Sequence, residues 1–296
     1  VGKTTASAAT ATLAATRGLK TLVISTDPAH SLSDVLQSRL TDTETQVKGT
    51  KGLYARELDV ANWFNNLRKR LKEKAERAFE LAPKAEVPAD LAALRNLLDC
   101  APPGIDELAA LSCLTDALVQ ERFKRIVVDP SPSTHGVRVV ELAGTARAWF
   151  TSLAAVLAKY RTKGLGELAD DVNAMLKHVQ RFEAALASPS ESRFVVVTRG
   201  EELASARTER LVDYLKERNL QVERVLVNRV LPKSACPKCE NRRKVELNVA
   251  KAVEKKIGLP VTVAPALGRH PAGLRELKAF RTAWYALSAT QKIKAA

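Results

Sequence analysis

The chain has 296 residues, of which 46% are hydrophobic and 27% are charged. Such a composition excludes a disordered chain and leaves room for one large or two smaller domains. No apolar stretch is long enough to cross a bilayer and no signal peptide is visible, so we expect a cytoplasmic protein. The four cysteines are therefore expected as thiols or metal ligands rather than as structural disulfides.

The net charge of +14 and the pI of about 9.8 favour binding to polyanions, anionic membrane surfaces or phosphorylated ligands. The plainer interpretation is a soluble protein from a proteome rich in arginine and alanine. The wide spread of the basic residues favours that interpretation, because only Arg68–Arg77 and Lys233–Lys256 concentrate them.

The chain begins with VGKTT, which matches the end of the phosphate-binding loop G-x-x-x-x-G-K-[ST] through Gly2, Lys3 and Thr4. The first four positions of the pattern would precede Val1. The strand that leads into such a loop, and that lies centrally in its sheet, would precede them. We therefore expect a chain cut inside the loop, which binds ATP poorly as it stands.

An alanine- and threonine-rich segment, Thr4–Arg17, follows the loop pattern and is predicted to be a helix with Gly18 as its C-cap. A helix that opens on this sequence directs free backbone N–H groups and the positive end of its dipole at an anion. This context makes a chance match of three residues the weaker interpretation.

Five apolar, β-branched runs predict strands, and helical patterns separate them. Alternating strands and helices predict an α/β fold with a mostly parallel sheet covered on both faces, as in P-loop NTPases. The runs are KTLVISTD (20–27), FKRIVVDP (123–130), RFVVVTRG (193–200), VERVLVNRV (222–230) and LPVTVAP (259–265).

Two longer segments, at about 60–121 and 144–187, exceed simple crossovers and carry apolar residues at helical spacing. We expect them to pack as one helical subdomain, inserted in a single ATPase domain that spans residues 1–296. Ordinary helix packing explains most of these apolar positions. A groove that holds a transmembrane helix is the functional alternative.

Aspartates end two of the predicted strands, where ligands bind in open α/β sheets. Asp129 stands where a Walker-B aspartate would hold Mg²⁺, together with the hydroxyl of Thr4. Lys3 would neutralise the β- and γ-phosphates, and Asp27 ends the first run. Either aspartate alone could instead cap a following helix, but the pair together with the loop pattern favours a nucleotide site.

Four further motifs, together with VGKTT, resemble those of the ArsA/Get family of ATPases. They are STDPAHSLSDVL (25–36) as the first switch, DPSPSTHGVRVVEL (129–142) as the second switch, LVNRVLP (226–232) as the adenine-contacting strand and CPKC (236–239) as a cysteine pair. That family has the deviant loop G-K-G-G-V-G-K-T, and it includes the arsenical-pump ATPase and the ATPase that targets tail-anchored membrane proteins. The order and spacing agree from residue 1 to about residue 275.

The resemblance assigns roles to single residues. Asp27 would orient or activate the attacking water, Lys3 would assist catalysis, and Asp129 with Thr4 would hold Mg²⁺. The nucleotide would be bound by residues from the loop, both switches and the adenine-contacting strand, namely Gly2, Lys3, Thr4, Thr5, His30, Pro132, His135 and Asn228. Loop structure without chemistry is the alternative for the two histidines.

The sequence departs from the family pattern in the second switch. Thr134 replaces a glycine, and Pro130 replaces the threonine after the aspartate. A glycine lets backbone approach the γ-phosphate, so Thr134 is expected to change the closed geometry and the hydrolysis rate. The signature lysine of the deviant loop, which crosses a dimer interface in the family, would precede Val1.

Cys236 and Cys239 have the spacing of half a tetrahedral zinc site. Two thiolates do not complete such a site, and the resemblance implies a Zn²⁺ shared between the cysteine pairs of two protomers. A redox dithiol and idle surface thiols are the alternatives. Cys100 and Cys113 lie in helical context and are expected to be buried and inert.

The resemblance therefore implies a cytoplasmic, Mg²⁺-dependent ATPase that cycles between open and closed homodimers. Targeting of tail-anchored membrane proteins, through their hydrophobic transmembrane segments, is the task that it favours. An arsenite- or anion-pump subunit is the first alternative. A partitioning-type ATPase that binds DNA or membrane is the second, although we expect no nucleic acid partner. A hydrolysis-poor holdase or redox chaperone is the third.

Overall fold

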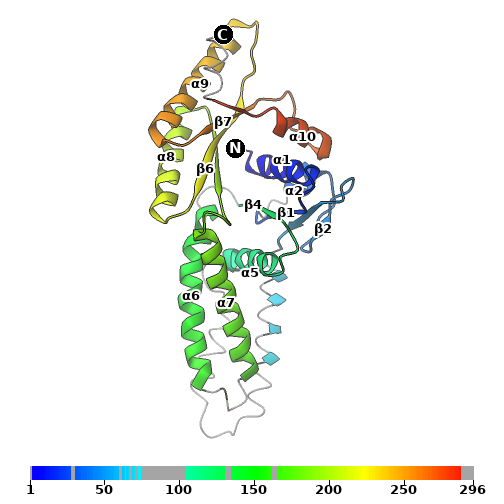
Figure 1. The fold of residues 1–296 in the computed structure, drawn as a ribbon, viewed down its shortest axis with the longest axis vertical. Coiled ribbons are helices and arrows are strands. Elements are labelled where there is room, and N and C mark those ends of the chain that lie inside the picture. The colour runs from blue at the N-terminus through cyan, green and yellow to red at the C-terminus, as the bar shows by residue number, and fades with distance from the viewer. Residues whose placement is uncertain are drawn as a thin grey trace.

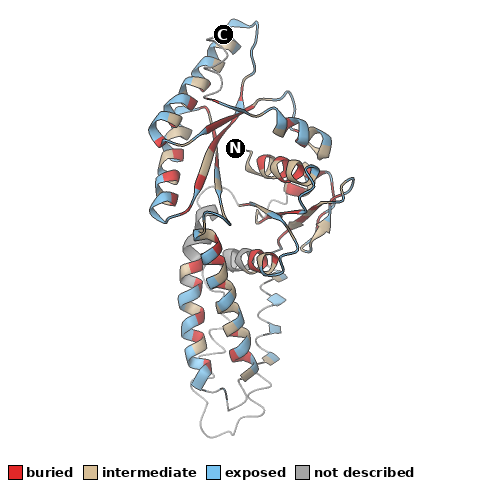
Figure 2. Cartoon of the chain, viewed as in Figure 1, coloured by how far each residue is buried: buried red, intermediate tan, exposed pale blue. Residues whose placement is uncertain are grey.

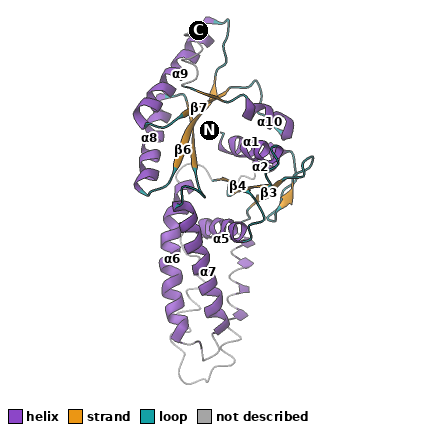
Figure 3. Ribbon diagram, in the orientation of Figure 1, coloured by secondary structure: helices purple, strands orange, loops and turns teal. Residues whose placement is uncertain are grey.

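The computed structural model describes residues 2–27, 31–59, 105–130, 135–159, 161 and 166–287, with short helical pieces at 62–63, 65–66, 69–70 and 73–74. Its strands form two four-stranded sheets. Figure 1 and Figure 3 show these sheets in one half of the molecule and the long helices α6 and α7 in the other. The predicted α/β class, with mostly parallel strands flanked by helices, is confirmed.

The first sheet has the strand order β2-β3-β1-β4. Its strands are β1 (Thr21–Ser25), β2 (Thr45–Gln46), β3 (Leu53–Glu57) and β4 (Arg125–Asp129). The strand β1 runs parallel to both β3 and β4, whereas β2 pairs antiparallel with β3. The register sets Ser25 opposite both Glu57 and Asp129, so three polar residues end neighbouring strands side by side.

The second sheet has the order β5-β6-β7-β8. Its strands are β5 (Phe194–Arg199), β6 (Val222–Val230), β7 (Val261–Pro265) and β8 (Tyr285–Ala286). The first three are parallel, and β8 pairs antiparallel with β7. All five strands predicted from apolar runs are present, as β1, β4, β5, β6 and β7.

The strand β3 was not predicted. Its sequence, LYARE, alternates between buried and half-buried positions instead of forming a continuous apolar run. The inward positions hold Leu53, Ala55 and the carboxylate of Glu57. A glutamate on the buried face of a strand breaks the pattern on which the prediction relied.

The helix α1 (Lys3–Thr16) lies against both sheets. Small side chains on its buried face, among them Ala8 and Ala9, share one apolar cluster with Val23 of β1, Leu226 of β6 and Ala264 of β7. Alanine allows a helix to approach a sheet closely. The predicted helix and its terminator are confirmed, since Gly18 follows the helix with a φ of 86°.

Further helices cover the sheets. The helices α2 (Ser31–Leu36) and α10 (Gly273–Thr282) pack on or beside α1. The helices α8 (Glu202–Glu217) and α9 (Pro237–Ile257) pack on the second sheet through a cluster that includes Val212, Val225 and Val253. Figure 3 shows α8 and α9 on one side of the strands and α1, α2 and α10 on the other.

The long helices described in the helical half are α5 (Ile105–Val119), α6 (His135–Lys159) and α7 (Gly166–Ala187). They share an apolar cluster that includes Leu114, Phe150, Leu157, Val172 and Phe182. Buried and exposed positions alternate along α6 and α7, as Figure 2 shows. The helix α6 begins before residue 144, the expected start of the second helical segment. None of the described helices combines the length and the apolar character needed to cross a membrane.

We predict that Gly200→Ala destabilises the fold. Gly200 directly follows β5, and a Cβ there would lie 2.9 Å from Cβ and 3.0 Å from both Cα and the carbonyl oxygen of Glu246. Backbone must shift to relieve such contacts, so we expect a loss of about 1–3 kcal/mol in the free energy of unfolding. Urea denaturation measures it.

The matched control is Gly268→Ala. A Cβ at Gly268 would meet no atom within 4 Å. We expect this variant to match or slightly exceed the wild-type stability, since alanine restricts the unfolded chain. Equal unfolding midpoints for the two variants would contradict the close packing of Gly200 on α9.

Candidate functional site

The predicted phosphate loop lies at the start of α1. Gly2 is the N-cap of this helix, in the left-handed region with a φ of 92°. Lys3, Thr4 and Thr5 form the first turn, where backbone N–H groups have no acceptor within the helix. The first turn contains no acidic residue. These N–H groups, the helix dipole and the Lys3 charge therefore favour an anion at this end.

Asn228 lies directly against the loop. A Cβ at Gly2 would come within 2.4 Å of Asn228 Nδ2, and the φ of 92° at Gly2 also favours glycine. Asn228 is buried near the end of β6, and its Oδ1 accepts a hydrogen bond from the Arg229 backbone N–H at 2.9 Å. The pairing of β6 with β7 shifts register between Val227 and Val230, and Arg229 has a φ of 61°. This irregularity bends the strand end locally and aims Asn228 at the loop.

Asp129 ends β4 and is fully buried. The hydroxyls of Ser7 and Ser25 lie 3.4 and 3.5 Å from its two carboxylate oxygens. Burial raises the pKa of Asp129 to about 6; hydrogen bonding from Thr4 and the charge of Lys3 oppose that rise, and the charge of Asp27 adds to it. The carboxylate is thus held in a site that disfavours its charge.

The predicted magnesium ligands lie together. The Thr4 hydroxyl contacts the Asp129 carboxylate, and it accepts a hydrogen bond from the Ser31 hydroxyl at 3.3 Å. A carboxylate and hydroxyl oxygens are ligands that suit Mg²⁺. A buried carboxylate with a raised pKa also gains from a nearby cation. The donor set therefore fits the metal that a P-loop site requires.

Asp27 lies two residues beyond β1 and is half-buried. Its backbone N–H donates to the Ser25 hydroxyl at 3.3 Å, and its charge acts on Asp129. The structure therefore brings Lys3, Thr4, Asp27 and Asp129 to one edge, at the carboxyl ends of β1 and β4 and the start of α1.

Other predicted residues are not placed at this edge. His30, Pro132 and the substituted Thr134 lie outside the described residues, and the side chain of His135 does too, although its backbone begins α6. Of the remaining predicted cysteines, Cys100 is outside the described residues. Cys113 is buried, as predicted, and burial raises the pKa of its thiol to about 12.

Cys236 and Cys239 lie on another element. Cys236 is the N-cap of α9 and Cys239 is in its first turn, and both thiols are exposed. Hydrogen bonds from the Cys239 backbone N–H, and then from the Cys239 thiol, lower the pKa of Cys236, whereas the bond to Cys236 raises the pKa of Cys239. The described residues contain no group of three or more His, Cys, Asp or Glu that could hold a metal. The predicted Zn²⁺, shared between the cysteine pairs of two protomers, stays a prediction.

Sequence reasoning missed Glu57, at the end of β3. Glu57 is a buried residue, only 5% exposed. It accepts hydrogen bonds from the Ser33 backbone N–H at 2.9 Å and the Ser33 hydroxyl at 2.6 Å. Ser33 lies in α2, within the predicted first switch. The signal was available as a glutamate on the inward-facing side of an alternating strand.

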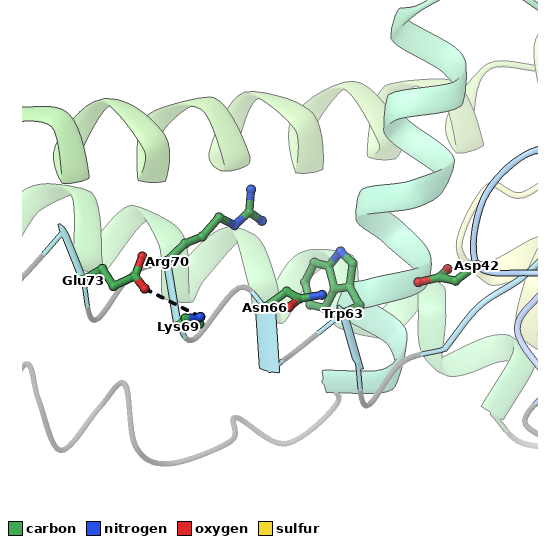
Figure 4. A pocket seen from close by; sticks show the side chains of 6 residues that line it. All are labelled: Asp42, Trp63, Asn66, Lys69, Arg70 and Glu73. Atoms are coloured by element: carbon green, nitrogen blue, oxygen red, sulfur yellow. Dashed lines mark ion pairs between the residues drawn. The ribbon is translucent and has the colours of Figure 1, made fainter.

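A pocket of about 530 Å³ lies elsewhere. Figure 4 shows that it is lined by Asp42, Trp63, Asn66, Lys69, Arg70 and Glu73. Trp63 also packs against the apolar cluster of the helical half, and Lys69 pairs with Glu73 at 4.0 Å. None of the residues predicted for the nucleotide lines this pocket, and its mixture of charges gives no anion preference.

Comparison with known proteins gives a consistent result. The family described as "Anion-transporting ATPase" matches residues 1–286. The chain belongs to this family. The ArsA/Get resemblance seen in the motifs is thereby confirmed, and with it an ATPase of the ArsA/Get type.

Three relatives illustrate the breadth of the family. ATPase GET3C of Arabidopsis thaliana is 28% identical, over 94% of this chain and 78% of its own. ATPase ASNA1 homolog 1 of Paramecium tetraurelia is 26% identical, over 83% and 77% of the two chains. A protein of Aquifex aeolicus (strain VF5), whose name assigns it to the arsenical pump-driving ATPases, is 30% identical over 86% and 83%.

We predict that Asp129→Asn stabilises the magnesium-free protein at neutral pH. The pKa of Asp129 is raised to about 6 from 3.8, so the folded protein binds this proton more tightly than the unfolded chain. The stability that this proton provides is complete below about pH 4 and is lost as the pH rises through about 6. Asparagine avoids the loss, so we expect a gain on the order of 2 kcal/mol above pH 7.

Thermal melts in EDTA between pH 4 and pH 8 test this prediction. The difference between the two proteins should vanish toward about pH 4, where the aspartic acid is neutral in both states. Addition of Mg²⁺ and ATP should stabilise the wild type and not the variant. A variant less stable than the wild type at pH 8 without magnesium would contradict the burial argument.

Proposed function

We propose that this ATPase depends on Mg²⁺ and hydrolyses ATP at the edge formed by α1, β1 and β4. The observation that carries the proposal is the buried carboxylate of Asp129, in contact with the Thr4 hydroxyl and within the field of Lys3 and Asp27. Thr4 and Asp129 supply a pair of metal ligands. Lys3 supplies a positive charge for the phosphates, and Asp27 supplies a second carboxylate. Phosphoryl transfer needs little more than such positioning and charge stabilisation.

The chain's own groups have distinct tasks in this reaction. Backbone N–H groups of the first turn of α1 bind phosphate oxygens, and Lys3 neutralises charge on the β- and γ-phosphates. Thr4 and Asp129 would hold Mg²⁺, which would supply positive charge against the phosphate oxygens. Asp27 accepts a hydrogen bond from the attacking water and orients it toward the γ-phosphorus. The water oxygen bonds to that phosphorus as the bond from phosphorus to the bridging oxygen breaks. ADP leaves together with phosphate, which carries a proton of the water.

Asn228 is the proposed adenine contact, and it lies beside Gly2 at the loop. The roles of Thr5, His30, Pro132 and His135 in binding nucleotide follow from the family resemblance. The same resemblance supports a cytoplasmic homodimer that ATP closes and hydrolysis reopens.

Targeting of tail-anchored membrane proteins is the favoured task. The helical half supports it, because α6 and α7 carry half-buried or exposed apolar residues, including Trp149, Val156 and Leu176. In a closed dimer these positions could line a groove for an apolar helix. A pump subunit for arsenite or another anion is the alternative, favoured by the similarity to the Aquifex protein.

We predict that Asp27→Asn, made in the full-length protein, abolishes turnover while ATP still binds. Asparagine keeps the size of the side chain but no longer attracts a proton of the attacking water, so kcat should fall at least about 100-fold. Steady-state phosphate release and equilibrium binding of a fluorescent ATP analogue measure the two properties. Asp213→Asn, on the exposed face of α8, is the control and should keep the wild-type kcat. Unimpaired turnover in Asp27→Asn would rule out the proposed role.

We predict that the protein holds about one Zn²⁺ per two chains, since four thiolates complete a tetrahedral site. The double variant Cys236→Ser/Cys239→Ser should lose this zinc. Its dimer should dissociate at a higher protein concentration than the wild-type dimer. Elemental analysis and mass measurement by light scattering, with and without a chelator, test this. Cys113→Ala removes a thiol elsewhere and should keep the zinc. Unchanged zinc and unchanged dimer mass in the double variant would contradict the shared site.

A further inference from the structure

The carboxylate of Glu57 holds the helix α2 in place from a neighbouring strand. One of its oxygens accepts the Ser33 backbone N–H at 2.9 Å, and the other accepts the Ser33 hydroxyl at 2.6 Å. We propose that Glu57 is a positioning residue for ATP hydrolysis: through Ser33 it fixes α2, and through α2 it fixes Asp27. This proposal rests on the role of Asp27 under the proposed function.

The contact satisfies a specific need of α2. Ser33 is the third residue of this helix (Ser31–Leu36), so its N–H has no acceptor within the helix. A buried N–H without a partner is costly, and a carboxylate supplies a short, charge-assisted bond. Because α2 has only six residues, its own hydrogen bonds fix it weakly. An outside anchor therefore decides where this helix lies.

The anchor acts close to the reacting groups. Asp27 precedes α2 by a few residues, and Ser31 at the start of α2 donates to the Thr4 hydroxyl at 3.3 Å. At its other side Glu57 is paired with Ser25 of β1, and the Leu58 N–H bonds the Ser25 carbonyl at 3.1 Å. The Ser25 hydroxyl in turn contacts Asp129 and receives the Asp27 N–H. A displaced α2 would therefore disturb the placement of Asp27 and Thr4 together.

The same strand end continues into the helical half. Leu58 packs in the apolar cluster of α5, α6 and α7. Asp59 accepts the Asn62 N–H on its side chain at 3.0 Å and the Trp63 N–H on its carbonyl at 2.9 Å. Glu57, the anchor of the first switch, thus stands five residues before Asn62, the first described helical residue of this segment. A movement of α2 on ATP hydrolysis would reach the helical half through Glu57.

Kinetics of three variants test the proposal. Glu57→Ala should lower kcat about 10- to 100-fold, because a misplacement of about 1 Å suffices for such a loss. The KM for ATP should stay within about threefold, since none of the residues proposed to bind ATP is substituted. Glu57→Gln should restore kcat to within about threefold, because the amide accepts the Ser33 N–H and donates to its hydroxyl. Ser33→Ala, which keeps one of the two bonds, should lie between.

Hydrogen exchange provides a second measurement. It reports on the stability of α2 directly and does not depend on turnover. Exchange of the segment 31–36 should accelerate in Glu57→Ala and not in Glu57→Gln. Glu254→Ala is the matched control, because Glu254 also accepts a backbone N–H, from Val261 at 3.2 Å, but at the opposite ends of the parallel strands. We expect this control to leave kcat and the exchange of 31–36 unchanged.

Each of these results either supports or overturns the proposed role of Glu57. A wild-type kcat in Glu57→Ala overturns the proposal, and so does an equal loss of kcat in Glu57→Ala and Glu57→Gln. If Glu57→Ala does not fold, Ser33→Ala decides, since a wild-type kcat there also overturns it. Asp27→Asn, assayed in parallel, separates the two hypotheses. Its unimpaired turnover would refute the proposed function, whereas a loss there beside a normal Glu57→Ala would refute the anchor alone.

Discussion

The buried carboxylate of Asp129 is the constraint on which the edge formed by α1, β1 and β4 depends. It is buried at the end of β4, where its charge is disfavoured, and the hydroxyls around it stand at 3.4 and 3.5 Å. Burial removes the solvation of this charge by water. The charge of the nearby Lys3 opposes this effect but does not cancel it. A divalent cation would remove the conflict. The folded chain therefore carries an unfavourable electrostatic term that the proposed Mg²⁺ would relieve, which would link stability to function at a single residue.

The helix α1 transmits this constraint to the whole fold. Its first turn provides Lys3 and Thr4, and its alanine face packs on residues from both sheets. Larger side chains at Ala8 or Ala9 would lift the helix from the strands and carry Lys3 and Thr4 away from Asp129. The alanine-rich composition of α1, which on its own indicates only helix propensity, is therefore a geometric requirement of the site.

Much of this arrangement could be predicted from the sequence. Continuous apolar, β-branched runs are typical of buried parallel strands, and all five were found in the structure. The positions of Asp27 and Asp129 followed from their place after such runs. The strand β3 escaped prediction because its inward side includes Glu57, whose partner Ser33 is remote in the sequence. The position of the Asn228 side chain against Gly2 was not predicted either. It depends on a register shift between β6 and β7 that no local sequence pattern encodes.

Two buried carboxylates at one sheet edge can thus have different roles, one structural and one in binding a cation. Their hydrogen bonds distinguish the two roles. Glu57 accepts two bonds of 2.9 and 2.6 Å from Ser33, so its charge is already compensated by protein and it serves to hold α2. Asp129 has longer contacts with hydroxyls and a raised pKa, so a cation, which is Mg²⁺ in the proposed function, would stabilise its charge. Ser25 lies between the two strands and pairs with both residues. Because the satisfied carboxylate fixes the frame in which the unsatisfied one acts, loss of Glu57 should impair chemistry without removing any ligand of the nucleotide.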